Sequence, residues 1–184
     1  MSEKPSSYYG LGRKKYPAPG GNRRKKRGRL NGLLSVDFQD GDGYFYGSPV
    51  ASSDVVGAYL VDVARILEQK GYKQATILLD RHSTHQAKMK AHFQTLSAQA
   101  GLFIQVAFVH FAAYSPWMNV VEYAIHLLGQ QPLHHRHHEQ DLAALEARLD
   151  TYLAAHRLLT PEQIVNTMGH IEHLLKERLK KVNL

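Results

Sequence analysis

The sequence predicts an α/β fold in which a mixed sheet is flanked by helices, with further helices at the carboxyl end. Two observations support this prediction. Between residues 53 and 109, helical segments with a periodic apolar face alternate with short runs rich in β-branched and aromatic residues. Before them, two strand-like runs are separated by Asp-Gly steps, which are typical of hairpin turns. Strands that alternate with helices are expected to be parallel, with right-handed crossovers.

Composition limits the class of protein. The length of 184 residues suits one domain with an appendage, and the apolar content suffices for a core. No run approaches the roughly 18 to 20 apolar residues of a membrane span, and the basic amino-terminal segment lacks the apolar centre of a secretory signal. The absence of cysteine excludes disulfides and thiolate metal sites. We therefore expect a soluble cytoplasmic protein.

Positive charge is concentrated in residues 1–30, which hold ten lysines and arginines against one glutamate. The remaining residues hold thirteen basic and fifteen acidic side chains, so they are nearly neutral. Prolines, glycines and charge predict that residues 1–29 form a flexible arm, extended or disordered on its own. Basic side chains interleaved with tyrosines suit phosphate contacts and base stacking, although a non-specific solvated tail has the same composition. The candidate nucleic-acid-binding residues are Arg23, Arg24, Lys25, Lys26, Arg27 and Arg29.

The first predicted element after the arm is an antiparallel hairpin made of residues 30–36 and 44–50. In the turn between them, Asp40 and Asp42 each precede a glycine, and glycine accepts the positive φ that such turns require. The alternating aspartates also resemble calcium-loop ligands. The flanking helices and the later glutamate of that motif are missing, which favours turn chemistry.

The middle of the chain is predicted to form two helix–strand units. Ser53 or Asp54 caps the first helix, and Gly71 ends it. The uncharged run over residues 75–79 is typical of a central parallel strand that is buried on both faces. The elements in order are a helix over residues 53–70, this strand, a helix over residues 85–100 and a strand over residues 102–109.

Asp80 directly follows the strand over residues 75–79. In open α/β sheets, ligands and catalytic groups collect at the carboxyl ends of the strands. Asp80 can equally cap the following helix, with His85 in the first turn of that helix. Taken alone, this residue is compatible with both roles.

A helix is predicted to begin at residue 119. Pro116 breaks the preceding strand, Asn119 is a suitable N-cap, and Glu122 three residues later gives a pattern similar to a capping box. This pattern accounts for Glu122 without any catalytic role.

The carboxyl-terminal part is predicted to consist of two helices, over residues 139–156 and from Pro161 onward, the second capped by Thr160. We expect them to pack on the sheet rather than to form a dimerising hairpin. The preceding loop is rich in histidine, but adjacent imidazoles cannot all face one metal ion, so specific metal binding is the weaker interpretation. These histidines are His134, His135, His137 and His138.

Two segments carry a resemblance to a known family. Ile77-Leu78-Leu79-Asp80, followed by His85, resembles the Asp-Asn-x-x-x-His segment of mariner-like bacterial insertion-sequence transposases, members of the DDE endonuclease superfamily. The run Tyr-Ser-Pro-Trp-Met-Asn-Val-Val-Glu over residues 114–122 resembles that family's Tyr-Ser-Pro-x-Leu-Asn-Pro-Ile-Glu segment. The similarity covers residues 30–153, including the order of hairpin, helix, strand, helix, strand and helix. It departs from the family at Arg81, where asparagine is usual, and at Trp117-Met118 and Val120 in the second segment.

The resemblance implies a ribonuclease H-like fold and metal-dependent cleavage and transfer of DNA strands in transposition. Asp80 corresponds to the second catalytic carboxylate and Glu122 to the third, and both would ligate Mg²⁺ or Mn²⁺. His85 would lie beside the metal, and Asn119 would help to aim Glu122. The domains implied are a basic flexible arm over residues 1–29, a ribonuclease H-like DDE domain over residues 30–157 and a carboxyl-terminal helix over residues 158–184.

The first catalytic carboxylate of the family has no counterpart at its expected place. It belongs on a strand that precedes the hairpin, and residues 1–30 contain no aspartate. Asp37 lies late in a strand expected to run antiparallel to the Asp80 strand, which places it at the opposite end of the sheet. We therefore expect a domain that lacks its first strand and is inactive as an isolated chain. Its expected partners are DNA, an upstream polypeptide that supplies the first aspartate, and a second copy in a homodimer.

An alternative function is that of a non-catalytic nucleic-acid-binding remnant, which acts through the basic arm. Magnesium-dependent nicking that is lost when Asp80 or Glu122 is replaced would favour the transposase interpretation. DNA binding that ignores both replacements and falls steeply with salt would favour the alternative. A histidine-rich metal-binding protein is a third and weaker interpretation.

Overall fold

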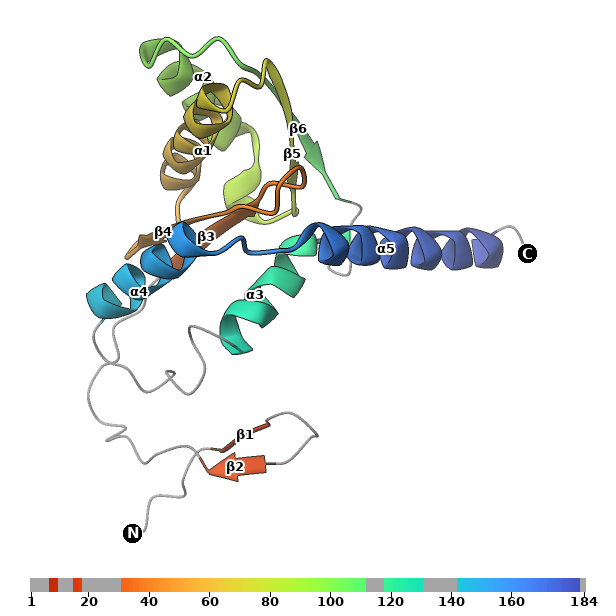
Figure 1. Ribbon diagram of the computed structural model, residues 1–184. Helices are drawn as coiled ribbons and strands as arrows, with labels where there is room; N and C mark the ends of the chain where they lie inside the picture. The colour runs from red at the N-terminus through yellow and green to blue at the C-terminus, as the bar shows by residue number, and fades with distance from the viewer. Residues whose placement is uncertain (1–6, 10–14, 18–30, 112–117, 131–141, 183–184) are drawn as a thin grey trace.

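The computed structural model describes residues 7–9, 15–17, 31–111, 118–130 and 142–182 (Figure 1). Within these ranges the chain is a mixed α/β structure with three two-stranded sheets. None of its described helices is long and apolar enough to cross a membrane. The elements are β1 (Ser7–Tyr9), β2 (Lys15–Pro17), β3 (Asn31–Val36), β4 (Gly43–Ser48), α1 (Ser53–Gln69), β5 (Gln74–Leu79), the 3-10 turn η2 (Ser83–His85), α2 (Ala87–Gln99), β6 (Gln105–His110), α3 (Val120–Gln130), α4 (Leu142–Ala155) and α5 (Pro161–Val182).

The predicted hairpin is confirmed, because β3 and β4 pair antiparallel in continuous register. Gly41 at its turn has a φ of 80°, and an added Cβ would lie 1.8 Å from the carbonyl oxygen of Leu159. The Gly41 carbonyl accepts hydrogen bonds from the backbone N–H groups of Leu158 and Leu159, at 2.8 and 3.0 Å. Only glycine fits a turn with this φ and this close a neighbour.

The hairpin lies between two apolar cores, because successive side chains of a strand point to opposite faces. Leu33 and Tyr44 pack against the core formed with α1, α2 and β5. Leu34 and Phe45 pack against the core formed with α3, α4 and α5. Figure 1 shows the corresponding layers, with α1 and α2 on one side of the hairpin and α3 and α4 on the other.

The first long helix has the predicted position but a different cap. The hydroxyl oxygen of Ser52 accepts a hydrogen bond from the Val55 N–H at 3.3 Å, so Ser52 is the N-cap. The predicted caps, Ser53 and Asp54, are therefore wrong, and both lie inside the first turn. Gly71, with a φ of 92°, follows the last turn as predicted.

The predicted parallel strands are confirmed by the pairing of β5 with β6 from Gln74↔Gln105 to Leu79↔His110. The expectation that β5 is central and buried on both faces is wrong. Alternate residues are exposed, with Leu78 at 41% on β5 and Val109 at 47% on β6. Among the described residues these strands pair only with each other. Ile77 and Phe108 pack against the core formed with α1 and α2, whereas Leu78 and Val109 lie on the other face and are exposed.

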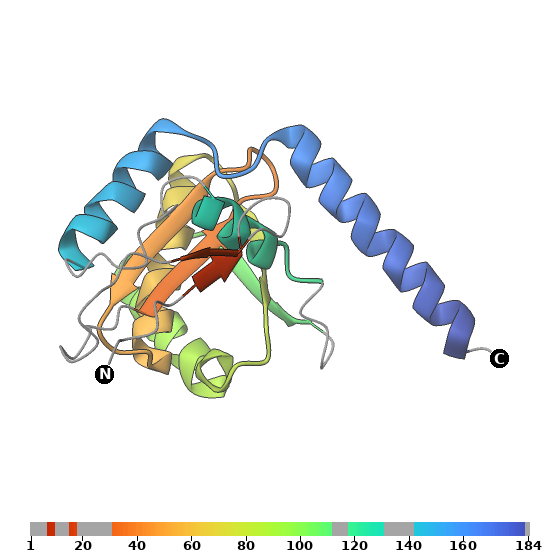
Figure 2. The same ribbon diagram turned by 90° about the horizontal axis from the view of Figure 1, so that it is seen from below.

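The two carboxyl-terminal helices differ in their packing. α4 lies on the hairpin, where the Glu146 carboxylate accepts a hydrogen bond from the Gly47 N–H at 3.1 Å. α5 begins as predicted, with Thr160 as its cap and Pro161 at its first position. Figure 2 shows that most of α5 projects from the body, and Val165 is 69% exposed. The expectation that both helices pack on the sheet is therefore wrong for most of α5.

The described parts of the amino-terminal arm form a short antiparallel hairpin. β1 and β2 pair from Ser7↔Pro17 to Tyr9↔Lys15. The arm was predicted to be extended or disordered, and in these six residues the backbone is extended and paired. Its main basic run, residues 23–29, lies outside the described residues.

Candidate active site

Asp80 lies immediately after β5, at the carboxyl end of the parallel pair. Its Oδ1 atom accepts a hydrogen bond from the His82 N–H at 2.9 Å and lies 2.6 Å from Nδ1 of His85. The Asp80 side chain is 51% exposed and that of His85 19% exposed. Asp80 therefore does not cap α2, since its bonds go to the turn between the strand and that helix. One of its oxygens is held in place, and the group remains open to solvent.

The turn that carries Asp80 is tied to the end of β6. The Arg81 Nε atom donates a hydrogen bond to the Phe111 carbonyl oxygen at 2.9 Å. Nδ1 of His110 lies 3.1 Å from the carbonyl oxygen of Asp80. Arg81, at the position where the family that the sequence resembles has asparagine, thus has a structural role here, because it joins the carboxyl ends of the two parallel strands.

The first turn of α3 presents Glu122. Asn119 caps this helix as predicted, since its side-chain oxygen accepts from the Val121 N–H at 3.2 Å and its carbonyl from the Glu122 N–H at 3.0 Å. Glu122 is exposed. Among the described residues the Glu122 carboxylate forms no hydrogen bond back to the Asn119 backbone, so the reciprocal bond of a capping box, which the sequence pattern indicated, is not formed.

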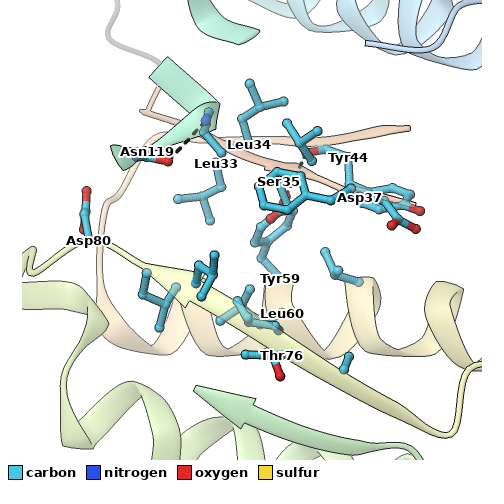
Figure 3. Close-up of a pocket in the computed structure, with 18 of the residues that line it drawn as sticks. Leu33, Leu34, Ser35, Asp37, Tyr44, Tyr59, Leu60, Thr76, Asp80 and Asn119 are labelled. Carbon is cyan, nitrogen blue, oxygen red and sulfur yellow. Dashed lines mark hydrogen bonds between the residues drawn. The ribbon is translucent and has the colours of Figure 1, made fainter. Parts of the chain in front are cut away.

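One cavity of about 450 Å³ brings the predicted site residues together. Its lining includes Asp80 and His85 from the β5 side and Asn119 and Glu122 from the start of α3. Figure 3 shows Asp80 and Asn119 at the same end of this cavity. Two carboxylates that are far apart in the sequence therefore line one cavity, and the start of the helix that carries Glu122 lies at its Asp80 end. We call this end the Asp80 rim.

The donor set at this rim suits a hard cation only in part. Carboxylate oxygens are the ligands that Mg²⁺ prefers, and Mg²⁺ is commonly held by one or two of them, with water and phosphate oxygens completing the shell. Asp80 and Glu122 meet that minimum. Among the described residues there is no group of three or more side chains able to hold a metal ion. The two carboxylates fit Mg²⁺ as an incomplete protein ligand set.

A cluster that the sequence did not reveal lies beside the opposite end of the cavity. Of its members, Asp37 lines the cavity, and Lys70, Asp40 and Asp42 do not. The Lys70 ammonium lies 2.6 Å from Asp40, 2.7 Å from Asp42 and 3.4 Å from Asp37. Asp37, which directly follows β3, lines the cavity, but Figure 3 places it at the end away from Asp80, as the sequence predicted. The distance along the cavity and the ion pair with Lys70 both separate Asp37 from the Asp80 rim.

Electrostatics in this Lys70 cluster favour the charged forms. Burial acts to raise the pKa of Asp40, but hydrogen bonds from Lys70 and from the Asp42 backbone outweigh it and hold the pKa below its ordinary value of 3.8. Burial acts to lower the pKa of Lys70, but its bonds to Asp40 and Asp42 hold that pKa above its ordinary value of 10.5. Asp40 and Asp42 therefore serve the hairpin turn rather than a calcium site.

Several predicted functional segments lie outside the described residues. They are the basic run over residues 23–29, the loop over residues 112–117 that carries most of the second family-like motif, and the histidine-rich loop over residues 131–141. Their predicted roles in nucleic-acid contact, in aiming Glu122 and in metal binding remain predictions.

Comparison of the chain with models of protein families, with curated proteins and with solved structures finds no match. The site is therefore interpreted from its own residues and geometry.

Proposed function

We propose that this chain carries part of a metal-dependent phosphodiester-cleaving site of the DDE transposase type, on an incomplete ribonuclease H-like domain. The observation that carries the proposal is the presence of both Asp80 and Glu122 in the lining of one cavity. One carboxylate comes from the carboxyl end of a parallel strand and the other from the first turn of a later helix. The order of hairpin, helix, strand, helix, strand and helix also matches what the sequence resemblance implies.

Asp80 and Glu122 would hold Mg²⁺ or Mn²⁺, which supplies activation of a water or hydroxyl group and stabilisation of the leaving oxygen. The residues around them supply position. The His82 N–H and the His85 ring fix one oxygen of Asp80 and leave the second free. Asn119 fixes the start of α3 and thereby the place from which Glu122 extends. DNA is the proposed substrate, because the lysines and arginines of the basic arm suit contacts with backbone phosphates. Such contacts position the substrate but carry no sequence information.

A test is the nicking of supercoiled plasmid by the full chain in Mg²⁺ or Mn²⁺. We expect slow nicking that requires the metal and is reduced at least tenfold in Asp80→Asn and Glu122→Gln. Asp62→Asn and Glu172→Gln are matched controls, since these carboxylates are exposed on α1 and α5. Both controls should nick at the wild-type rate. Nicking that is equal in all five proteins would contradict the proposal.

A non-catalytic nucleic-acid-binding function is the alternative, favoured by the lack of a third metal ligand among the described residues. In that case the chain binds DNA without cutting it. Replacing the six basic residues at 23–27 and 29 by glutamine would then reduce the slope of log affinity against log salt by about 5. Absence of nicking together with such a change in slope would favour this alternative.

A further inference from the structure

The shape of the cavity carries a second inference, which concerns the backbone rather than the carboxylates. The cavity is lined by every residue from 32 to 39 and by every residue from 74 to 80. A cavity over the face of a sheet would be lined by alternate residues, since successive side chains point to opposite faces. Continuous lining means that the cavity faces the edges of β3 and β5.

Within the described part of the chain, neither of these edges has a strand partner. There β3 pairs only with β4 and β5 only with β6, so each strand is bonded along one edge, and the second edge faces the cavity (Figure 3). The two strands run in opposite directions across it. Figure 3 places Leu33 near the Asp80 end and Asp37 at the far end, whereas β5 runs from Thr76 toward Asp80. Open edges are templates for pairing with another strand.

The cavity is covered on its other sides by apolar groups from two helices. α1 contributes Val56, Leu60 and Val63, and α3 contributes Val121 and Ile125. A ligand in this position would have helices on both of its faces and backbone donors and acceptors along both of its edges. An extended polypeptide satisfies that arrangement, because its N–H and C=O groups alternate between its two edges.

We propose that the cavity between β3 and β5 accepts one extended strand from a partner polypeptide, which joins the β3–β4 hairpin and the β5–β6 pair into one sheet. The accepted segment is about seven residues long, to match the open edge of β5, and carries apolar side chains on both faces. It runs parallel to β5 and antiparallel to β3. This direction, and an acidic residue where the segment passes Asp80 and Glu122, rest on the proposed function.

The exposed apolar face of β5 is consistent with a missing neighbour. Leu78 lines the cavity and is 41% exposed. Its register partner on β6 is Val109, which is similarly exposed, at 47%, but does not line the cavity. The pair supplies a matched control. Leu78→Lys places a charge beside the accepted strand, while Val109→Lys places the same charge on the neighbouring strand.

The test uses random heptapeptides displayed on phage and selected against the full chain, without metal or DNA. We expect enrichment of proline-free peptides rich in β-branched residues. The tightest peptide, made synthetically, should bind Leu78→Lys at least tenfold more weakly than wild type, and Val109→Lys within twofold of wild type. Circular dichroism and thermal melting check that both variants remain folded.

A scan of backbone N-methylation along the selected peptide identifies the binding mode. A strand bonded on both edges uses the N–H groups of successive residues, so methylation at nearly every position should weaken binding at least tenfold. Loss at alternate positions only would mean pairing with a single edge, and would overturn the proposal. Three other results would also overturn the proposal. They are a failure to enrich any peptide, equal binding of the peptide to Leu78→Lys and wild type, and a dimer of the chain that excludes the peptide.

These outcomes are separate from those of the proposed function. Peptide binding by the predicted pattern, combined with an absence of metal-dependent nicking, would leave the strand acceptor standing and remove the catalytic role. Nicking that depends on Asp80 and Glu122, without peptide binding, would support the catalytic role and remove the strand acceptor.

Discussion

The two ends of the cavity both carry aspartates, yet they differ in how those aspartates are used. At the hairpin end, Asp37, Asp40 and Asp42 surround the Lys70 ammonium. At the other end, the described partners of Asp80 are a backbone N–H and a histidine ring, and Glu122 is exposed. Carboxylates that neutralise a lysine hold the fold together. Carboxylates without such a cation remain available to a divalent ion. The candidate metal site is therefore distinguished by the lack of a lysine partner, not by the number of acidic residues.

The largest expected effect tests the structural end of the cavity. Gly41→Val should lower the free energy of unfolding by at least about 3 kcal/mol, because it combines an unfavourable φ with a collision at the Leu159 carbonyl. Gly71→Val is the matched control, since its φ of 92° is similarly unfavourable but no atom lies within 4 Å of the added Cβ. It should cost about 1 to 2 kcal/mol. Urea unfolding measures both, and equal losses would contradict the close contact at Gly41.

A smaller effect separates the two ends directly. Lys70→Met should lower the free energy of unfolding by about 1 to 2 kcal/mol, because it leaves three aspartates close together without their cation. Asp80→Asn should change stability by less than about 0.5 kcal/mol, because that side chain is half exposed. Urea unfolding near neutral pH compares the variants. A larger loss for Asp80→Asn than for Lys70→Met would reverse the roles assigned to the two ends.

The pH dependence sharpens the same contrast. The pKa of Asp40 is lowered in the folded state, so its contribution is present above pH 3.8 and is lost as the pH falls through the folded value below it. The pKa of Lys70 is raised, so its contribution is complete below pH 10.5 and is lost as the pH rises through the folded value above it. The stability difference between wild type and Lys70→Met should therefore be level between these limits and shrink outside them. A difference that changes steadily between pH 5 and pH 9 would contradict this assignment.

Local sequence signals specified much of this fold. The Asp-Gly steps predicted the β3–β4 turn, Thr160 and Pro161 predicted the start of α5, and the uncharged run before Asp80 predicted β5. Such signals locate a helix end only to within about one residue. At the start of α1, for example, the neighbouring serines at 52 and 53 are equally suitable as caps. The long-range pairing of Lys70 with the hairpin turn has no local signal, because it depends on where α1 ends in space.

The candidate site was predicted in part for a related reason. Asp80 and Glu122 each follow a parallel strand in the sequence, and the carboxyl ends of parallel strands share an edge, so their meeting at one rim could be expected. The burial of β5 was misjudged because its uncharged apolar run is typical of a strand that is covered on both faces. Among the described residues β5 pairs only with β6, and Leu78 stays 41% exposed.

The central claim is that Asp80 and Glu122 bind one cation together. Titration of Mn²⁺ followed by electron paramagnetic resonance tests it in wild type, Asp80→Asn, Glu122→Gln and the double variant, with Asp62→Asn as control. We expect either single change to weaken Mn²⁺ binding at least tenfold and the double change to add little, because each carboxylate needs the other. Single losses that multiply in the double variant, or Mn²⁺ binding that is the same in all five proteins, would show that the two carboxylates do not share an ion.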